Sequence, residues 1–250
     1  MRPEISDCSP AADLGRGEME TWHYTDLIKA HKFFIKEEGR FTFYDAYIKA
    51  RDLKAWFQSS DVPLKEGLLL FGWVHSWDPN FQGDLTIFLQ IYEGIFPSVK
   101  TFENETLIDI DFTGDAKDSL HEIFESIANC TRKKRFGKQR FESTDTSKIL
   151  HVLIPKLFVM WDREIRRGIL GDAERKSARE YVYEFLPEMQ KLAKTFLDSY
   201  INEKGGDYES AAQDISKMVD NYTLAKSIDE LNYLIYTRRI SLNEIRNTQL

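Results

Sequence analysis

The stretch Leu64–Trp77, LKEGLLLFGWVHSW, is apolar on nearly every side when it is wound as a helix. A surface helix carries one apolar stripe, whereas a helix that is apolar all round belongs inside a core. This stretch is too short to cross a bilayer, which takes about 20 residues. Pro63 directly before it suits the first turn of a helix, where its missing N–H is not needed. The stretch therefore predicts a buried core helix around which other helices pack.

Amphipathic patterns flank this stretch on both sides. Apolar residues recur every three or four positions over 25–38 and 41–58, which is the period of a helix with one buried face. Further helices are expected at 116–129, 146–153, 161–170, 172–204 with a kink or restart at Pro187, 207–222, 228–238 and from 241 onward. Asp172 is expected to cap the long helix that follows it. Together these patterns predict an all-α, multi-helix globular fold.

The region near 85–112 has two interpretations. Gly83–Phe96 is rich in β-branched and aromatic residues, which favour strands, yet its length suits a helix. Thr106–Phe112 alternates apolar and acidic residues, as a short strand or a helical turn would. We favour a helix for the first part and keep a short strand pair near 85–112 as the alternative.

The first 20 residues and the overall composition indicate how the chain is divided into domains. Residues 1–20 are polar and aperiodic, so we expect a mobile leader there. Hydrophobic residues make up 42% of the chain and aromatics 13%, which is enough for a substantial core. Residues 21–250 are expected to form a single helical domain, and a sub-boundary near residue 171 stays open.

Several classes of function have no support in the sequence. Cys8 and Cys130 are too few for a disulfide framework or a zinc site, and the acidic residues at 109–118 lack the spacing of an EF-hand. No metal and no cofactor are therefore expected. The sequence contains neither the apolar core of a signal peptide nor a membrane span, so we expect a cytoplasmic or nuclear protein without a membrane partner.

One short segment is strongly basic. Thr131–Arg140, TRKKRFGKQR, holds six basic residues and no acid: Arg132, Lys133, Lys134, Arg135, Lys138 and Arg140. Because the whole chain totals −7 and this run contributes +6, the rest of the chain carries −13. Basic residues interleaved with Phe136 and Phe141 can hold phosphates and stack on bases. The segment predicts an exposed loop that contacts nucleic acid, or one that neutralises acidic neighbours.

A second segment, 146–169, carries a resemblance to a known family. Within TSKILHVLIPKLFVMWDREIRRGI, an apolar run leads to Asp162 at a helix start, with Ile165 and Arg167 following. The stretch Pro155–Arg167 resembles the segment around the catalytic aspartate of helix-hairpin-helix DNA glycosylases of the base-excision-repair superfamily. The Gly-x-Gly turn of that family has no counterpart, since 135–147 contains only Gly137.

The resemblance implies roles for particular residues. Asp162 would be the catalytic acid and Lys148 the nucleophile, because a desolvated lysine can attack a sugar carbon while a carboxylate stabilises the developing charge. A flipped base needs an aromatic pocket. The side chains expected to line it are Trp161, His151, Trp73 and Trp77. The alternative for Asp162 is a helix cap, and for the aromatic residues a place in the core.

Three functions follow from the sequence. One is a DNA-glycosylase-like, nucleic-acid-binding protein whose partner is DNA. Another is a helical protein that binds nucleic acid through the basic patch at 132–140 without catalysis. The third is a non-catalytic helical module that binds another protein or regulates it, in which every feature above is structural.

Overall fold

Helices make up almost all of the regular structure, as the sequence predicts. The computed structural model describes residues 22–38, 44, 62–77, 84–130, 133–135, 138–140 and 143–249. The predicted leader and the helix expected at 41–58 lie outside these residues, apart from Tyr44. The described elements are α1 (Tyr24–Glu38), α4 (Val62–Trp77), α5 (Leu85–Lys100), α6 (Asp115–Cys130), β1 (Lys133–Arg135), β2 (Lys138–Arg140), α7 (Ser143–Leu153), α8 (Arg163–Leu170), α9 (Ala178–Glu180), the π-helical turn η1 (Tyr181–Phe185), α10 (Leu186–Lys204), α11 (Tyr208–Met218), α12 (Leu224–Asn232), the π-helical turn η2 (Tyr233–Thr237) and α13 (Leu242–Arg246).

Local polar contacts decide where several helices begin. Asp84 caps α5 by accepting from the amide of Ile87, and Thr223 caps α12 by accepting from that of Lys226. Such contacts satisfy amides that have no partner inside the helix. Asp207 and Ser241 form reciprocal capping boxes at α11 and α13. The starts of these helices are therefore set by residues that lie within a few positions of one another in the sequence.

The structure confirms the helix favoured for 83–96 and corrects several other expectations about these elements. The helix at 64–77 is not buried on every side, because Leu68 and Leu69 of α4 are 44% and 59% exposed, while Leu70, Trp73 and Val74 are buried. No strand pair forms near 85–112, because α5 occupies 85–100 and turns follow it. The strand pair lies instead at 133–140, inside the basic run predicted to be a loop. The long helix does not start at Asp172, whose side chain accepts from Glu174 in a turn. It starts after Ser177 and passes through η1 just before Pro187.

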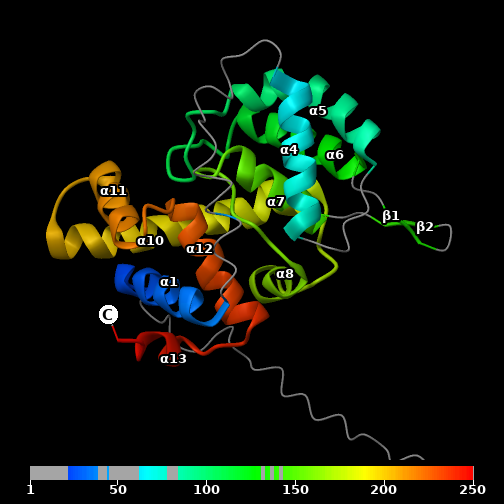
Figure 1. Cartoon of the computed structure of the whole chain (residues 1–250). Helices are drawn as coiled ribbons and strands as arrows, with labels where there is room; N and C mark the ends of the chain where they lie inside the picture. The colour runs from blue at the N-terminus through cyan, green and yellow to red at the C-terminus, as the bar shows by residue number, and fades with distance from the viewer. Residues whose placement is uncertain are drawn as a thin grey trace, which may run out of the picture.

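The helices form two groups that share one core. α4, α5, α6 and α7 pack on one another, while α1 packs against α10, α12 and α13. Figure 1 shows α1 and α13 on the opposite side of the molecule from α5 and α6, with α7 and α10 between them. One hydrophobic cluster contains side chains from both groups and from both sides of residue 171. None of the helices in the described ranges is long and apolar enough to span a membrane.

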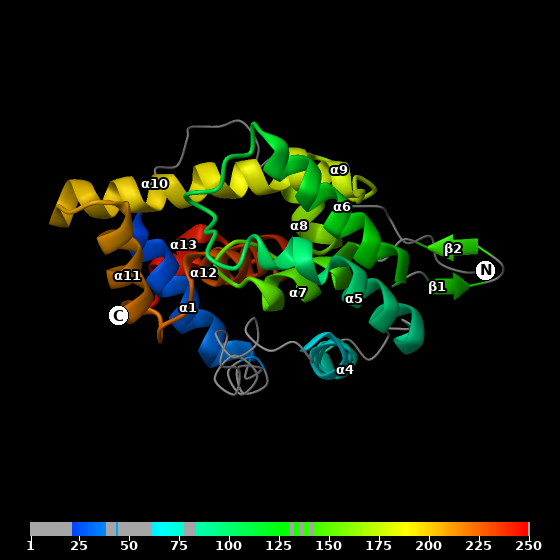
Figure 2. The same ribbon diagram turned by 90° about the horizontal axis from the view of Figure 1, so that it is seen from above.

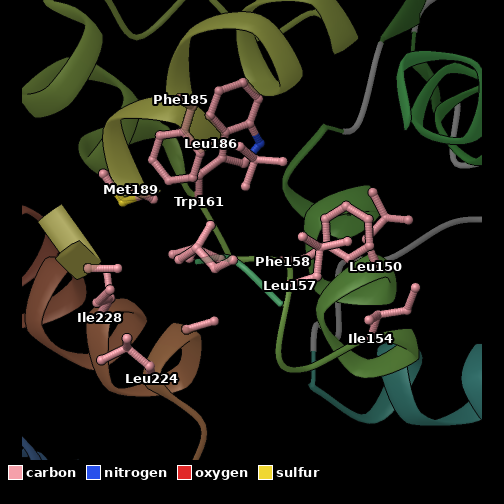
Figure 3. Packing of buried hydrophobic residues seen from close by; sticks show 14 of the residues in the cluster. Leu150, Ile154, Leu157, Phe158, Trp161, Phe185, Leu186, Met189, Leu224 and Ile228 are labelled. Carbon is pink, nitrogen blue, oxygen red and sulfur yellow. The ribbon is translucent and has the colours of Figure 1, made fainter. Parts of the chain in front are cut away.

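A non-helical segment, 154–162, runs through this core. Its buried side chains lie between those of α7, α10 and α12 (Figure 3). Buried backbone polar groups need partners, and side chains from elsewhere supply them. Tyr181 donates to the carbonyl of Val159 at 2.8 Å, and Thr223 donates to that of Pro155 at 2.6 Å. Much of the segment that resembles a glycosylase site therefore belongs to the hydrophobic core, with Leu157, Phe158, Val159, Trp161 and Ile165 as members.

Candidate functional site

Asp162 is the N-cap of α8. Its Oδ1 accepts hydrogen bonds from the amides of Glu164 and Ile165, both at 2.8 Å. Its Oδ2 accepts from the hydroxyl of Thr237 in η2 at 2.5 Å. Both carboxylate oxygens therefore have donors, and the side chain ties α8 to η2. A carboxylate that is to act on a sugar needs an oxygen directed at the substrate, whereas these oxygens are directed at the protein.

Trp161, expected in a base pocket, lies inside the core. It is only 1% exposed, and its ring lies 4.8 Å from that of Tyr181 and 5.2 Å from that of Phe185. Figure 3 shows Trp161 beside Phe185. Its indole N–H donates to the carbonyl of Ser143 at 3.2 Å. Among the described residues, Trp161 is therefore surrounded by protein and is almost closed to solvent.

His151, also expected at the pocket, is buried in a different part of the core. Its Nδ1 lies 2.6 Å from the carbonyl oxygen of Phe158, and its Nε2 lies 2.9 Å from the hydroxyl of Tyr44. The contact with Phe158 provides a partner for a buried carbonyl of segment 154–162, as Tyr181 does for the carbonyl of Val159. His151 thus resembles a core histidine whose ring nitrogens are both satisfied.

Lys148 lies beside an acidic residue of its own helix, and Trp73 lies on another helix. The Nζ of Lys148 lies 3.9 Å from Oδ1 of Asp145 on its own helix, and the lysine side chain is 16% exposed. Trp73 is buried on α4, and Trp77 ends that helix with a side chain outside the described residues. Trp73 and Trp161 therefore belong to separate stretches of the core. They do not form one aromatic box around Asp162 among the described contacts.

The basic run forms a two-stranded antiparallel ribbon. β1 and β2 pair in the register Lys133–Arg140, Lys134–Gln139 and Arg135–Lys138, while Arg132 lies outside the described residues. Directly opposite residues share a face of such a ribbon, and successive residues alternate between faces. Positions 133, 135, 138 and 140 therefore lie on one face, and all four are basic. The sequence singled out these residues but not this shared face, which depends on the register.

The ribbon projects from the body between α6 and α7. Figures 1 and 2 both show it standing away from the packed helices. α7 begins at Ser143 soon after β2, and this start is fixed to the core. Arg166, 95% buried, donates from Nη1 to the hydroxyls of Ser143 and Thr144 at 3.3 and 3.2 Å, and its Nε donates to the carbonyl of Ala173. The ribbon is thus carried on a firmly anchored helix.

A buried ionic cluster, which we call the α12 cluster, was not singled out in the sequence. It consists of Lys226, Asp229 and Glu230 on α12, together with His31 on α1. Lys226 Nζ lies 2.8 Å from Asp229 Oδ2 and 3.6 Å from Glu230 Oε1. Glu230 Oε2 lies 2.8 Å from His31 Nδ1, and His31 Nε2 lies 3.4 Å from Oδ2 of the exposed Asp220. All four cluster residues are buried.

The pKa values in the α12 cluster follow from its geometry. Burial acts to lower the pKa of Lys226, but the charges of Asp229 and Glu230 outweigh burial and raise it. Burial raises the pKa of Asp229 against the opposing effect of Lys226. Burial likewise acts to lower the pKa of His31, and the hydrogen bonds and charges of Glu230 and Asp220 raise it overall. The cluster therefore favours cationic Lys226 and cationic His31.

Only a weak signal of this cluster exists in the sequence. Lys226, Asp229 and Glu230 stand at the i, i+3 and i+4 spacing that places them on one helix face. That spacing is usual on solvated helix faces, where it carries no functional meaning. Every residue of α12 is buried, and this is a consequence of packing from α1, α10 and α11.

Among the described residues, no group of three or more His, Cys, Asp or Glu side chains is arranged to hold a metal ion. Comparison with known proteins adds no assignment, since no family model, curated protein or solved structure matches this chain.

Proposed function

We propose that this protein binds duplex DNA through the β1–β2 ribbon. The observation that carries the proposal is the register of the ribbon, which places four basic residues on one face: Lys133, Arg135, Lys138 and Arg140. Like charges directly opposite each other destabilise a strand pair. A row of phosphates against this face would remove that repulsion, so the ribbon is suited to a polyanion.

The shape of the ribbon favours DNA in the B form. The major groove of B-form DNA is about 12 Å wide and admits a two-stranded β-ribbon. The major groove of A-form RNA is deep and too narrow for side chains to read. The ribbon projects from the body in both views, so it can reach a groove without a collision of the helices (Figures 1 and 2).

The charge of the remaining chain confines the contact to the ribbon. Outside the basic run the chain carries −13, which repels phosphates. About four to six phosphate contacts are therefore expected. Each releases counterions, so the logarithm of the affinity should fall against the logarithm of salt with a slope of about −4 to −5. Between 50 and 200 mM salt this is a loss of about 10²- to 10³-fold in affinity.

The proposal concerns binding and not base excision. To act on a sugar, Asp162 would have to give up the amides of Glu164 and Ile165 and the hydroxyl of Thr237. Trp161 would have to leave the core to stack on a base. Asp162 is better suited to the cap role that it has, and the glycosylase activity implied by the resemblance gains no supporting contact.

Fluorescence anisotropy with a labelled duplex tests the proposal. The ribbon variant changes the four basic residues of the shared face to alanine, and it should bind at least about tenfold more weakly with a slope reduced to about −2. A matched control removes the same charge from exposed body positions: Lys36, Lys100, Lys191 and Lys217. The control should keep the wild-type slope.

Two results would count against the proposal. Absence of duplex binding by the wild type at 50 mM salt would leave the protein-interaction module as the function to pursue. Equal loss of affinity in the ribbon variant and in the body control would mean that net charge, and not the ribbon face, attracts DNA.

A further inference from the structure

We infer that His31 is a protonation-dependent latch that holds helix α1 on helix α12. The latch is independent of the ribbon and of DNA binding. It consists of the histidine of α1 seated between two carboxylates, Glu230 of α12 and Asp220 of the loop before α12.

The geometry around the imidazole favours its cation. Nδ1 lies 2.8 Å from a carboxylate oxygen of Glu230, and Nε2 lies 3.4 Å from one of Asp220. A neutral imidazole has one N–H and one nitrogen lone pair, so it can donate to only one of these two acceptors. The imidazolium has two N–H groups and donates to both. A neutral His31 would instead place a lone pair against a carboxylate oxygen.

The charge balance of the α12 cluster also favours protonated His31. Lys226 contributes one positive charge, and Asp229 and Glu230 contribute two negative charges. With neutral His31 the buried set carries one uncompensated negative charge, whereas protonated His31 makes it neutral. An unpaired buried charge is strongly unfavourable. Glu230 is fully buried, so solvent cannot take over the role of the imidazolium.

The groups around His31 from other elements support this balance. Lys226 is the cation on α12. Its closest partner is Asp229 at 2.8 Å, and the negative charge of Asp229 offsets the effect of the Lys226 charge on His31. Tyr222 places its ring edge-on at 5.2 Å from the imidazole. Two charged groups of other helices packed on α1 have partners of their own: Arg246 of α13 pairs with Asp26, and Lys217 of α11 pairs with Asp214. On α10, Glu203 pairs with Lys204 and accepts a hydrogen bond from Tyr24.

The direction of the pH effect follows from linkage. Glu230 and Asp220 hold the pKa of His31 above its ordinary value of 6.5 in spite of burial. Protonated His31 therefore stabilises the docked position of α1 fully below pH 6.5, and this stabilisation is lost as the pH rises through the raised pKa. Each unit by which the folded pKa exceeds 6.5 corresponds to about tenfold in the equilibrium for undocking α1. Mild alkalinisation should thus loosen α1 before the rest of the protein.

Two measurements on the full chain test the latch. The first follows the imidazole C–H resonances of the wild type by NMR from pH 5 to 9, with the His31 signal assigned through His31→Gln. The second measures hydrogen exchange of α1 amides relative to those of α10, corrected for the intrinsic rate at each pH. In the wild type, α1 protection should fall at least severalfold between pH 6 and 9, while α10 protection stays constant.

The variants separate the latch from ordinary packing. His31→Gln should lower α1 protection at pH 6 and give a flat pH profile. Asp26→Asn is the matched control, because it weakens another α1 contact, the pair with Arg246, without removing the histidine. It should lower α1 protection while keeping the wild-type pH dependence.

Two outcomes would overturn the inference. One is a His31 resonance that titrates below 6.5, which would mean that the imidazole sits neutral between the carboxylates. The other is wild-type α1 protection that does not change with pH. Both are read on the wild type, so they hold even if a variant fails to fold.

Discussion

The indole N–H of Trp161 donates a hydrogen bond to the carbonyl oxygen of Ser143 at 3.2 Å. Ser143 is the first residue of α7 and follows the basic ribbon closely along the chain. The contact joins a buried core residue to the helix that follows the ribbon that we propose to bind DNA. Arg166, whose guanidinium lies 5.2 Å from the Trp161 ring, bonds the hydroxyl of the same serine.

Trp161→Phe should destabilise the protein without a direct effect on DNA. The change keeps most of the apolar surface but leaves the Ser143 carbonyl without its indole donor, which costs about 1–3 kcal/mol. Urea unfolding measures the loss. Below the unfolding transition, anisotropy should give the wild-type salt slope. A large loss of DNA affinity in a fully folded variant would instead indicate that the indole contacts a base.

Asp162→Ala should act through helix capping. It removes the acceptor for two amides and for Thr237, so the loss of stability should be about 1–2 kcal/mol. Thr237→Val tests the second contact separately and should lose less, since it leaves both amide contacts in place. Thermal unfolding of both variants provides the comparison. A stable Asp162→Ala protein that has lost a base-excision activity of the wild type would reverse this assignment.

Gly168→Ala should be strongly destabilising. A Cβ at this position of α8 would lie 2.1 Å from Cδ1 of Tyr236 in η2. Relief requires movement of the tyrosine ring or of the two elements, at a cost of about 1–3 kcal/mol. Gly94→Ala in α5 is the matched control, because no atom lies within 4 Å of its added Cβ. The control should be stabilised by up to about 1 kcal/mol through helix propensity, as measured by chemical denaturation.

Lys226→Met should lose more stability than a double variant that also removes a carboxylate. The single change leaves Asp229 and Glu230 buried without their cation, which costs about 3–5 kcal/mol. Adding Asp229→Asn restores the charge balance between Glu230 and protonated His31. The double variant should therefore recover about half of the loss. Additive effects in a double-mutant cycle would contradict the coupling that the 2.8 Å ion pair implies.

The helices could be predicted because they depend on neighbouring residues. The period of apolar side chains and the caps at Asp207 and Ser241 act over a few residues, and the all-α fold follows from them. The strand pair at 133–140 was expected to be a loop, because three-residue strands have no clear period of their own. They are defined by pairing across the chain, as Lys133 is with Arg140.

The candidate sites depend on tertiary structure to a greater extent. The sequence by itself determined that residues 131–140 are basic and that Asp162 stands at a helix start. The register of the ribbon, the burial of Trp161 and the enclosure of Lys226 were decided only by packing, which brings together residues as distant as His31 and Glu230. Burial is the physical reason, because a charged side chain that is removed from water needs a partner of opposite charge in the protein.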